Sequence, residues 1–227
     1  MSHDMMKQRA AYLAAQWVKD DMLVGIGTGS TTQFFIDALS KRCHQGLRIN
    51  AVCSSVASYA RAKKENIPLI DDHQVTAIDM TFDGADEIDA QKRMIKGGGG
   101  ALTREKILAN ASREMVVLVD ETKKVAQLGG EKLPVEILSF AHVATIAKIR
   151  TLGFRGELRL HSDGRPFQTD NGNLIYDIEF QKPRSTPEKD HERLIHIPGV
   201  VETGYFFNLA GRVLIGMSSG EVEVWEH

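Results

Sequence analysis

Apolar and polar positions along the chain follow two rhythms, and the first holds up to Leu133. In this part, short apolar runs of strand length alternate with segments in which apolar residues recur at helical spacing. Helices between buried strands favour a mostly parallel sheet that is covered on both faces. The expected strands are residues 22–27, 49–54, 68–70, 75–82 and 115–119, and the expected helices are residues 32–39, 56–65 and 102–111.

The second rhythm, after Leu133, predicts the order strand, helix, strand, strand, helix, strand. This order is typical of the split βαβ, or ferredoxin-like, arrangement. Two further apolar runs near the C-terminus are expected to return as strands to the first sheet. The expected strands are residues 135–138, 157–161, 174–180 and 200–206, followed by 213–215 and 222–225, and the expected helices are residues 143–152 and 187–195.

Composition narrows the possible partners and the compartment. A net charge of −2, with no basic or acidic tail, argues against nucleic acid as the main partner. No apolar run reaches membrane-spanning length, and the N-terminal segment predicts an amphipathic helix rather than a cleaved leader. Cys43 and Cys53 lack a Cys-x-x-Cys spacing, as is usual in a reducing cytosol. We expect a soluble cytoplasmic protein without nucleic-acid or membrane partners.

An acidic cluster follows the apolar run of residues 75–82. Asp83, Asp86 and Glu87 stand where this buried strand would surface. Ligands of open α/β sheets bind at the carboxyl ends of strands, so these carboxylates are candidate ligand contacts. The alternative is a solvated turn with no chemistry. A cation site that also includes Asp89 is a weaker alternative, because the spacing is not that of an EF-hand.

A glycine-rich segment comes next and joins the cluster to a helix. Residues Gly97 to Gly100 allow backbone conformations and close ligand approach that a Cβ would prevent. Thr103 is expected to be the N-cap of the helix, which places Glu105 in its first turn. With Lys96 just ahead, carboxylates, an ammonium and backbone N–H groups are expected on one rim. Such a set can move protons around a carbonyl group.

A second glycine loop runs from the first strand into the first helix of the sheet, as Gly25-Ile26-Gly27-Thr28-Gly29-Ser30-Thr31. N–H groups at a helix N-terminus attract anions, and the hydroxyl groups add donors for a phosphate. Ser30 stands where a dinucleotide fingerprint needs its third glycine, and the lysine of a nucleotide P-loop is missing. The loop therefore predicts a small phosphorylated ligand rather than NAD or ATP; the alternative is a tight turn with a hydroxyl cap.

Seven ordered blocks make the chain resemble the ribose-5-phosphate isomerase family of the A type. They are the GIGTGST loop ending at Thr31, DGADEI from Asp83, IKGGGGALTREK over residues 95–106, DETK over residues 120–123, LPVEI from Leu133, TDNGN from Thr169 and IPGVVETG from Ile197. One departure is the longer stretch SDGRPFQ around Asp163 and Gly164.

The resemblance implies a fold that agrees with the order of elements given above. We expect an α/β protein with a Rossmann-like, mostly parallel sheet domain of residues 1–131 plus 208–227. A smaller ferredoxin-like α+β domain, residues 132–207, is inserted before the C-terminal strands. The family also implies a homodimer or homotetramer, and the sequence does not choose between them.

The resemblance implies metal-independent, cofactor-free interconversion of ribose 5-phosphate and ribulose 5-phosphate through an enediolate, in the non-oxidative branch of the pentose phosphate pathway. Glu105 would be the base that moves the proton between C2 and C1. Lys96 and the glycine-loop N–H groups would stabilise the oxyanion, while Asp83 and Asp86 would hold hydroxyl groups and assist ring opening. The further implied substrate contacts are Thr28, Gly29, Ser30, Thr31, Gly84, Ala85, Gly97, Gly98, Gly99 and Lys123.

Other functions stay open at this point. A sugar-phosphate sensor would use a similar fold without catalysis. A coenzyme A transferase would need a coenzyme site, and Ser30 weakens an NAD-dependent dehydrogenase. The eight histidines show no H-x-x-x-H pattern, so no metal site is expected from them. Lys7 is not distinguishable from an ordinary helix-surface lysine.

Overall fold

The computed structural model describes residues 1–226, which form two compact units. The parallel-sheet unit comprises Met1–Ala85, Arg104–Lys124 and the segment from Leu209 onward, and the antiparallel unit comprises Asp86–Thr103 and Val125–Asn208. Residues 86–103 group with the antiparallel unit, where one of their two strands pairs with residues 205–206 and the other pairs with the first. The domain limits proposed from the sequence stay a prediction.

The parallel-sheet unit is built on six strands in the order β13-β12-β6-β3-β1-β2. All neighbours are parallel except β12 and β13, which pair antiparallel. The mostly parallel sheet and the return of the C-terminal strands to it are therefore confirmed. The strands are β1 Leu23–Ile26, β2 Asn50–Cys53, β3 Ile78–Asp83, β6 Ser112–Asp120, β12 Ala210–Gly216 and β13 Val222–Trp225.

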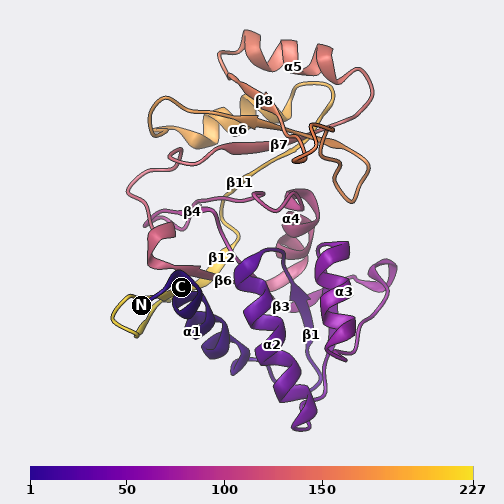
Figure 1. Ribbon diagram of the computed structural model, residues 1–227, viewed down its shortest axis with the longest axis vertical. Helices are drawn as coiled ribbons and strands as arrows, with labels where there is room; N and C mark the ends of the chain where they lie inside the picture. The colour runs from indigo at the N-terminus through magenta and orange to yellow at the C-terminus, as the bar shows by residue number, and fades with distance from the viewer. Residues whose placement is uncertain (227) are drawn as a thin grey trace. The chain divides into compact units, whose positions relative to one another are not determined.

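Four helices belong to this sheet: α1 His3–Ala15, α2 Ser30–His44, α3 Val56–Lys64 and α4 Leu102–Ala111 (Figure 1). Helices α1, α2 and α3 share one apolar core with the sheet, in which the rings of Phe35 and Phe82 stack at 4.4 Å. Leu108 of α4 packs in a separate cluster with Val52 and Ile78. Both faces of the sheet are thus covered, which keeps its apolar strands out of water.

Several elements of this unit differ from the sequence-based bounds: β3 begins at residue 78 and not 75, β6 spans 112–120 and not 115–119, and two elements differ more. Helix α2 extends beyond residue 39, because Ser40 in its polar last turns donates to the Glu65 carbonyl and holds that turn against α3. The expected strand at 68–70 reduces to a single bridge between Ala51 and Leu69. Short polar or apolar stretches of this kind carry too little periodicity to predict.

The antiparallel unit contains a four-stranded sheet in the order β10-β7-β9-β8. Its chain order of strands and helices is the expected ferredoxin-like one, and its core includes Ile149 of α5 and Leu194 of α6. The elements are β7 Leu133–Ile137, α5 His142–Thr151, β8 Gly156–Leu158, β9 Leu174–Ile178, α6 Pro187–Ile195 and β10 Val200–Thr203. Figure 1 shows α5 and α6 beside this sheet.

A small third sheet in this unit was not expected from the sequence, and the strand expected at 200–206 is divided between this sheet and the four-stranded one. The small sheet joins β4 Glu87–Ile88, β5 Met94–Ile95 and β11 Tyr205–Phe206 in the order β11-β5-β4. Strands of two residues are too short to show alternation, so the sequence gives no signal for them. Among residues 1–226, every helix is too short or too polar to span a membrane.

A buried carboxylate joins separate segments of the antiparallel unit. Glu136 of β7 has no exposed surface. Its Oε1 accepts hydrogen bonds from Thr169 Oγ1 at 2.9 Å, Asn173 Nδ2 at 2.9 Å and Asn171 Nδ2 at 3.1 Å, and its Oε2 accepts one from Thr103 Oγ1 at 2.5 Å. Neutral donors therefore compensate a charge that is out of water, and the TDNGN turn is fixed to the start of α4.

This cluster predicts a large stability effect. Glu136→Ala leaves the donors of Thr103, Thr169 and two asparagines without their acceptor, so the free energy of unfolding should fall by about 3 kcal/mol or more. The control is Glu179→Ala, which removes a half-exposed ion pair with Lys132 and should change it by less than about 1 kcal/mol. Urea unfolding of both variants tests this, and equal losses would contradict it.

Candidate active site

The candidate site residues fall into two groups, one in each unit. In the parallel-sheet unit, β1 lies between β2 and β3, so the strand order reverses direction there. The loops that follow β1 and β3 leave the sheet at this switch point, where ligands of doubly wound folds bind. Both loops carry residues that the sequence singled out, Thr28 to Thr31 and Asp83 to Ala85.

Asp83 ends β3 and is fully buried. Its Oδ1 accepts from the N–H of Gly84 at 2.8 Å and from the N–H of Thr28 at 3.1 Å. A Cβ on Gly27 would lie 2.0 Å from the Asp83 carboxyl carbon, so only glycine permits this approach. The carboxylate is therefore fixed between the two loops by backbone donors.

An anion-binding arrangement lies at the start of α2. Gly29, with φ at +120°, precedes the helix, and Ser30 is its first residue. The Nζ atom of Lys7 donates to Ser30 Oγ at 3.1 Å. Thr31 is buried and lies 3.9 Å from the Cβ position of Gly84. An ammonium, a hydroxyl and a helix N-terminus thus meet at one point, which suits a phosphate.

Lys7 is a residue whose role the sequence left undecided, because it lies 23 residues before Ser30 and only the fold brings them together. The same lysine interacts electrostatically with Asp120 at the end of β6. Burial by itself would raise the pKa of Asp120. Hydrogen bonds from Thr122 and His3, with the charge of Lys7, outweigh burial and lower that pKa below its ordinary value.

The two lysines that follow Asp120 are placed differently. Lys123 is half-buried and ends the short helix η2, Glu121–Lys123. Lys124 pairs with Glu223 at 3.0 Å and lies 5.1 Å from the ring centre of Trp225, so it belongs to the packing of β13. Lys123 is accordingly the better candidate for a ligand contact.

Glu105 lies in the first turn of α4 and is only 2% exposed. The positive end of the helix dipole favours its ionised form. The expected N-cap was wrong: Thr103 is the second residue of the helix and bonds to Glu136 instead. The sequence could not reveal that distant acceptor.

The second group of residues lies in the antiparallel unit, around the glycine loop 97–100. Asp86 Oδ2 accepts from the N–H of Gly98 at 2.8 Å. Lys96 is only 3% exposed; its N–H donates to the Gly204 carbonyl at 2.8 Å, and its ammonium lies 5.4 Å from the ring centre of Phe206. A surface lysine would not be buried in this way, so Lys96 remains a candidate for function.

Gly97 has φ at +107° and Gly100 has φ at +83°, conformations that L side chains rarely adopt. The N–H of Gly100 donates to the Gly97 carbonyl at 3.0 Å, which closes the loop into a turn. A Cβ on Gly98 would lie 2.8 Å from Asp86 Oδ1. The glycines are therefore required by the loop geometry itself.

The rest of the acidic cluster has structural partners. Glu87 is buried and accepts from the N–H groups of Gly129 at 2.6 Å and Glu131 at 2.7 Å. Asp89 accepts from the side chain of Arg93 at 2.7 Å. These contacts occupy the oxygens of Glu87 and Asp89, so the alternative of a cation site formed by the cluster loses two of its ligands.

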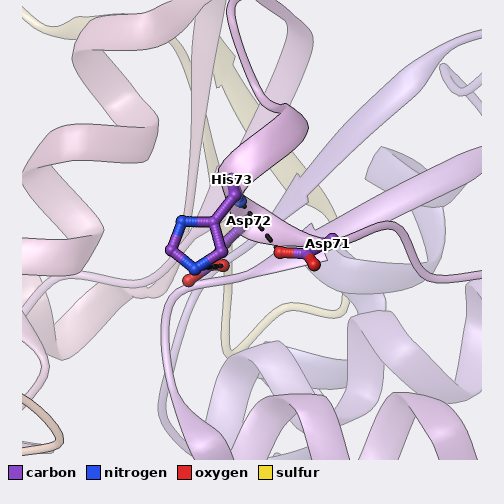
Figure 2. A group of neighbouring side chains, drawn as sticks. All are labelled: Asp71, Asp72 and His73. Carbon is purple, nitrogen blue, oxygen red and sulfur yellow. Dashed lines mark hydrogen bonds and ion pairs between the residues drawn. The ribbon is translucent and has the colours of Figure 1, made fainter.

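Figure 2 shows a different group, Asp71, Asp72 and His73, in and beside the short helix η1, Asp72–Gln74. Their potential ligand atoms lie within 4.8 Å of one another, and all three residues are exposed. Asp71 accepts from the N–H of His73 at 3.0 Å, as the cap of this helix. Exposed acidic caps of this kind have a structural role, and none of the three was a candidate from the sequence.

Comparison with known proteins agrees with this geometry. The family model of ribose 5-phosphate isomerase A (phosphoriboisomerase A) matches residues 50–220. A ribose-5-phosphate isomerase A of Protochlamydia amoebophila is 48% identical, over 96% of this chain and 94% of that protein. The one from Bacillus mycoides is 46% identical, over 95% and 97%.

A solved structure of a D-ribose-5-phosphate isomerase in complex with phospho-erythronic acid is also similar. It is 38% identical in sequence, covers all of both chains, and has a TM-score of 0.94. Family match, sequence identity and fold lead to the same conclusion. The chain belongs to the ribose 5-phosphate isomerase A family.

Proposed function

We infer that the chain is an aldose–ketose isomerase that interconverts ribose 5-phosphate and ribulose 5-phosphate, the reaction of its family, and we propose roles for its residues. The observation that carries these roles is the buried carboxylate of Glu105 in the first turn of α4. A carboxylate base is sufficient for such reactions, as in triosephosphate isomerase.

In the proposed mechanism, Glu105 removes the proton from C2 of the open-chain aldose while the C1 carbonyl is polarised. The electron pair of the C–H bond forms the C1–C2 double bond of an enediolate, and the carbonyl electrons move to O1. A proton then passes from O2 to O1, and Glu105 returns its proton to C1. The C–H bond is acidic only in the presence of the polarised carbonyl, so base and polarising donors must act together.

Lys96 and the backbone N–H groups of Gly97 and Gly99 are the proposed donors to the developing oxyanion, and Gly98 is a proposed substrate contact whose N–H holds Asp86. Burial supports this role for Lys96, because an ammonium away from water interacts more strongly with a negative charge. Preorganised donors of this kind contribute roughly 10²–10³ in rate each. They also take the place of a metal ion as the polarising group.

Asp83 and Asp86 are the proposed partners of the sugar hydroxyl groups and assist ring opening and the O–H proton transfer. Each has one carboxylate oxygen fixed by backbone donors. A fixed carboxylate can orient a hydroxyl group without reorganising. Gly84 and Ala85 follow Asp83 in the same loop and are proposed as substrate contacts.

The phosphate of the substrate is assigned to Thr28, Gly29, Ser30 and Thr31, with Lys123 and Lys7. The contact of Lys7 with Ser30 and the N-terminus of α2 support this assignment. Binding energy from the phosphate, which does not react, helps to hold C1 and C2 in position. A non-catalytic sugar-phosphate sensor would need this phosphate site but not the buried carboxylate of Glu105, so the sensor is not favoured.

We also propose a cytoplasmic location, a place in the non-oxidative pentose phosphate pathway, and a homodimer or homotetramer. The thiols of Cys43 and Cys53 are not in a disulfide, and burial raises the pKa of Cys53 to about 12, which keeps that thiol protonated. The free thiols are compatible with a reducing compartment. Light scattering of the purified chain decides between dimer and tetramer, and a monomeric mass would contradict the proposal.

The phosphate assignment predicts the effect of Lys7→Met. Loss of one charge-assisted contact should raise KM for ribose 5-phosphate about 10-fold, equivalent to ~1.4 kcal/mol. The matched control is Lys41→Met: Lys41 lies in the last turn of α2, the helix whose first residue Lys7 contacts, and its ammonium contacts Tyr12. Steady-state kinetics should show an unchanged KM for the control. Equal KM values for both variants would contradict the assignment of Lys7 to the phosphate.

The role of Glu105 predicts that Glu105→Gln lowers kcat by about 10²–10⁴, because the amide keeps the shape of the side chain but is no base. Binding of phospho-erythronic acid, measured by calorimetry, should persist. The control is Glu65→Gln at the end of α3, which should keep the wild-type rate.

Near-normal turnover of Glu105→Gln would contradict the assignment and move the base to Asp83 or Asp86. The assays should contain a chelator, because the proposed donors need no metal. A wild-type rate that is lost in chelator and restored by one added divalent ion would overturn that part of the mechanism.

A further inference from the structure

We infer that Arg159 is a positioning residue of the isomerase: it orients two peptide groups of the glycine loop, so that the N–H of Gly98 holds Asp86 and the N–H of Gly99 faces the developing oxyanion. The inference rests on the proposed function of that loop. Arg159 follows β8 in the antiparallel unit and lies about sixty residues beyond the loop in the sequence, so no local pattern indicates it.

The contacts of Arg159 are divided between two partners. Its Nη1 atom donates to the carbonyl of Gly97 at 2.9 Å and to the carbonyl of Gly98 at 3.0 Å. Its Nε and Nη2 atoms donate to the two carboxylate oxygens of Asp177 at 2.8 Å and 2.6 Å. One planar guanidinium therefore holds two consecutive peptide groups of the glycine loop while a bidentate ion pair holds the guanidinium.

The direction of the N–H groups follows from these carbonyl contacts. In a trans peptide group the C=O and the next N–H point in opposite directions, and no peptide bond of residues 1–226 is cis. The carbonyl of Gly97 faces Arg159, and the N–H of Gly98 faces the other way, to Asp86 Oδ2 at 2.8 Å. The carbonyl of Gly98 also faces Arg159, so the N–H of Gly99 is directed to the opposite side.

The surroundings of Arg159 make this orientation rigid. The side chains of Arg159 and Asp177 are only 16% and 12% exposed, so their ion pair is little screened by solvent. The guanidinium lies 5.7 Å from the ring centre of Phe167, and a Cβ on Gly100 would lie 2.4 Å from that ring. Phe167 belongs to the longer stretch around Asp163, which thus contributes a wall behind the glycine loop.

Lysine could not replace this arginine without loss. A single ammonium has no planar fork, so it cannot bind Asp177 in bidentate fashion and reach both glycine carbonyls together. Without Arg159, the glycines of the loop, which have the widest range of backbone conformations, would rotate their peptide groups. Misplacement of catalytic groups by about 1 Å can lower a rate roughly 10²-fold.

The chain offers a matched control for the test. Arg184 forms the same bidentate pair, with Asp190 at 2.6 Å and 2.9 Å, in the same unit. Its guanidinium also lies against a phenylalanine ring, that of Phe180, at 5.0 Å. Arg184→Met therefore removes a comparable ion pair and ring contact and leaves the contacts of the glycine loop in place.

The experiment measures kcat and KM for ribose 5-phosphate in the wild type and in Arg159→Met, Arg159→Lys and Arg184→Met. We expect kcat to fall about 10- to 100-fold in Arg159→Met with less than 3-fold change in KM, because oxyanion donors act on the transition state and the phosphate contacts remain. Arg159→Lys should restore kcat only in part, and Arg184→Met should keep the wild-type kcat within 2-fold.

A double variant tests whether Arg159 and Asp177 affect kcat through the same contact. Asp177→Asn should lower kcat in the same direction, and Arg159→Met with Asp177→Asn should lose no more than Arg159→Met alone, because both changes act through one contact. Wild-type kcat in Arg159→Met, or an equal fall of kcat in Arg184→Met, would overturn the inference. If Arg159→Met does not fold, a wild-type kcat in Arg159→Lys and Asp177→Asn would overturn it. An inactive wild type would instead refute the proposed function.

Discussion

Backbone N–H groups hold two carboxylates of the candidate site, those of Asp83 and Asp86, and the geometry of both glycine loops depends on this constraint. Asp83 is bound by the amides of Thr28 and Gly84, and Asp86 by the amide of Gly98. A carboxylate away from water must be hydrogen-bonded, and rigid peptide donors meet this need without neutralising its charge. The glycine loops are thus as necessary for the carboxylates as for a ligand.

In both loops, backbone N–H groups and not cationic side chains make the hydrogen bonds to Asp83 and Asp86 given above. Lys96 is buried beside Phe206, and the ammonium of Lys7 in α1 reaches Ser30 at the start of α2; both are proposed to interact with negative charge of the substrate. Arg159 has a different role from these lysines. In the antiparallel unit, Arg159 acts on carbonyl groups of the glycine loop, and so determines where the N–H groups on the other side of the same peptides point.

Much of the fold was predictable from the sequence because its apolar segments are long and periodic. Helices α4 and α6 and strand β13 have the predicted bounds, and the ferredoxin-like order and the return of the last strands are confirmed. The two-residue strands β4 and β5 escaped prediction, since they are too short to show alternation and β5 depends on pairing with distant β11. Thr103 was wrongly predicted as a cap, because its partner Glu136 is more than thirty residues away.

The residues of the candidate site also fall into those that a local sequence pattern identifies and those that only the fold brings together. Glycine loops and acidic clusters are local patterns, so the sequence identified Asp83, Asp86 and Gly97 to Gly99, whose roles stay proposals. Lys7, Glu136 and Arg159 act through partners at least 23 residues away along the chain. Tertiary contacts of this kind leave no signature in a single sequence, and only the fold brings such residues into view.

The central claim, a proton carried by Glu105 between C2 and C1 of an enediolate, is tested most directly by isomerisation in D₂O. The wild-type protein should convert ribose 5-phosphate to ribulose 5-phosphate that carries deuterium at C1 in part, as observed by NMR. A proton that rests on a carboxylate exchanges with solvent in competition with its return to carbon, so the incorporation is partial. Full turnover with no deuterium in the ketose, or in ribose 5-phosphate recovered from the reverse reaction, would indicate a direct hydride shift and contradict the mechanism.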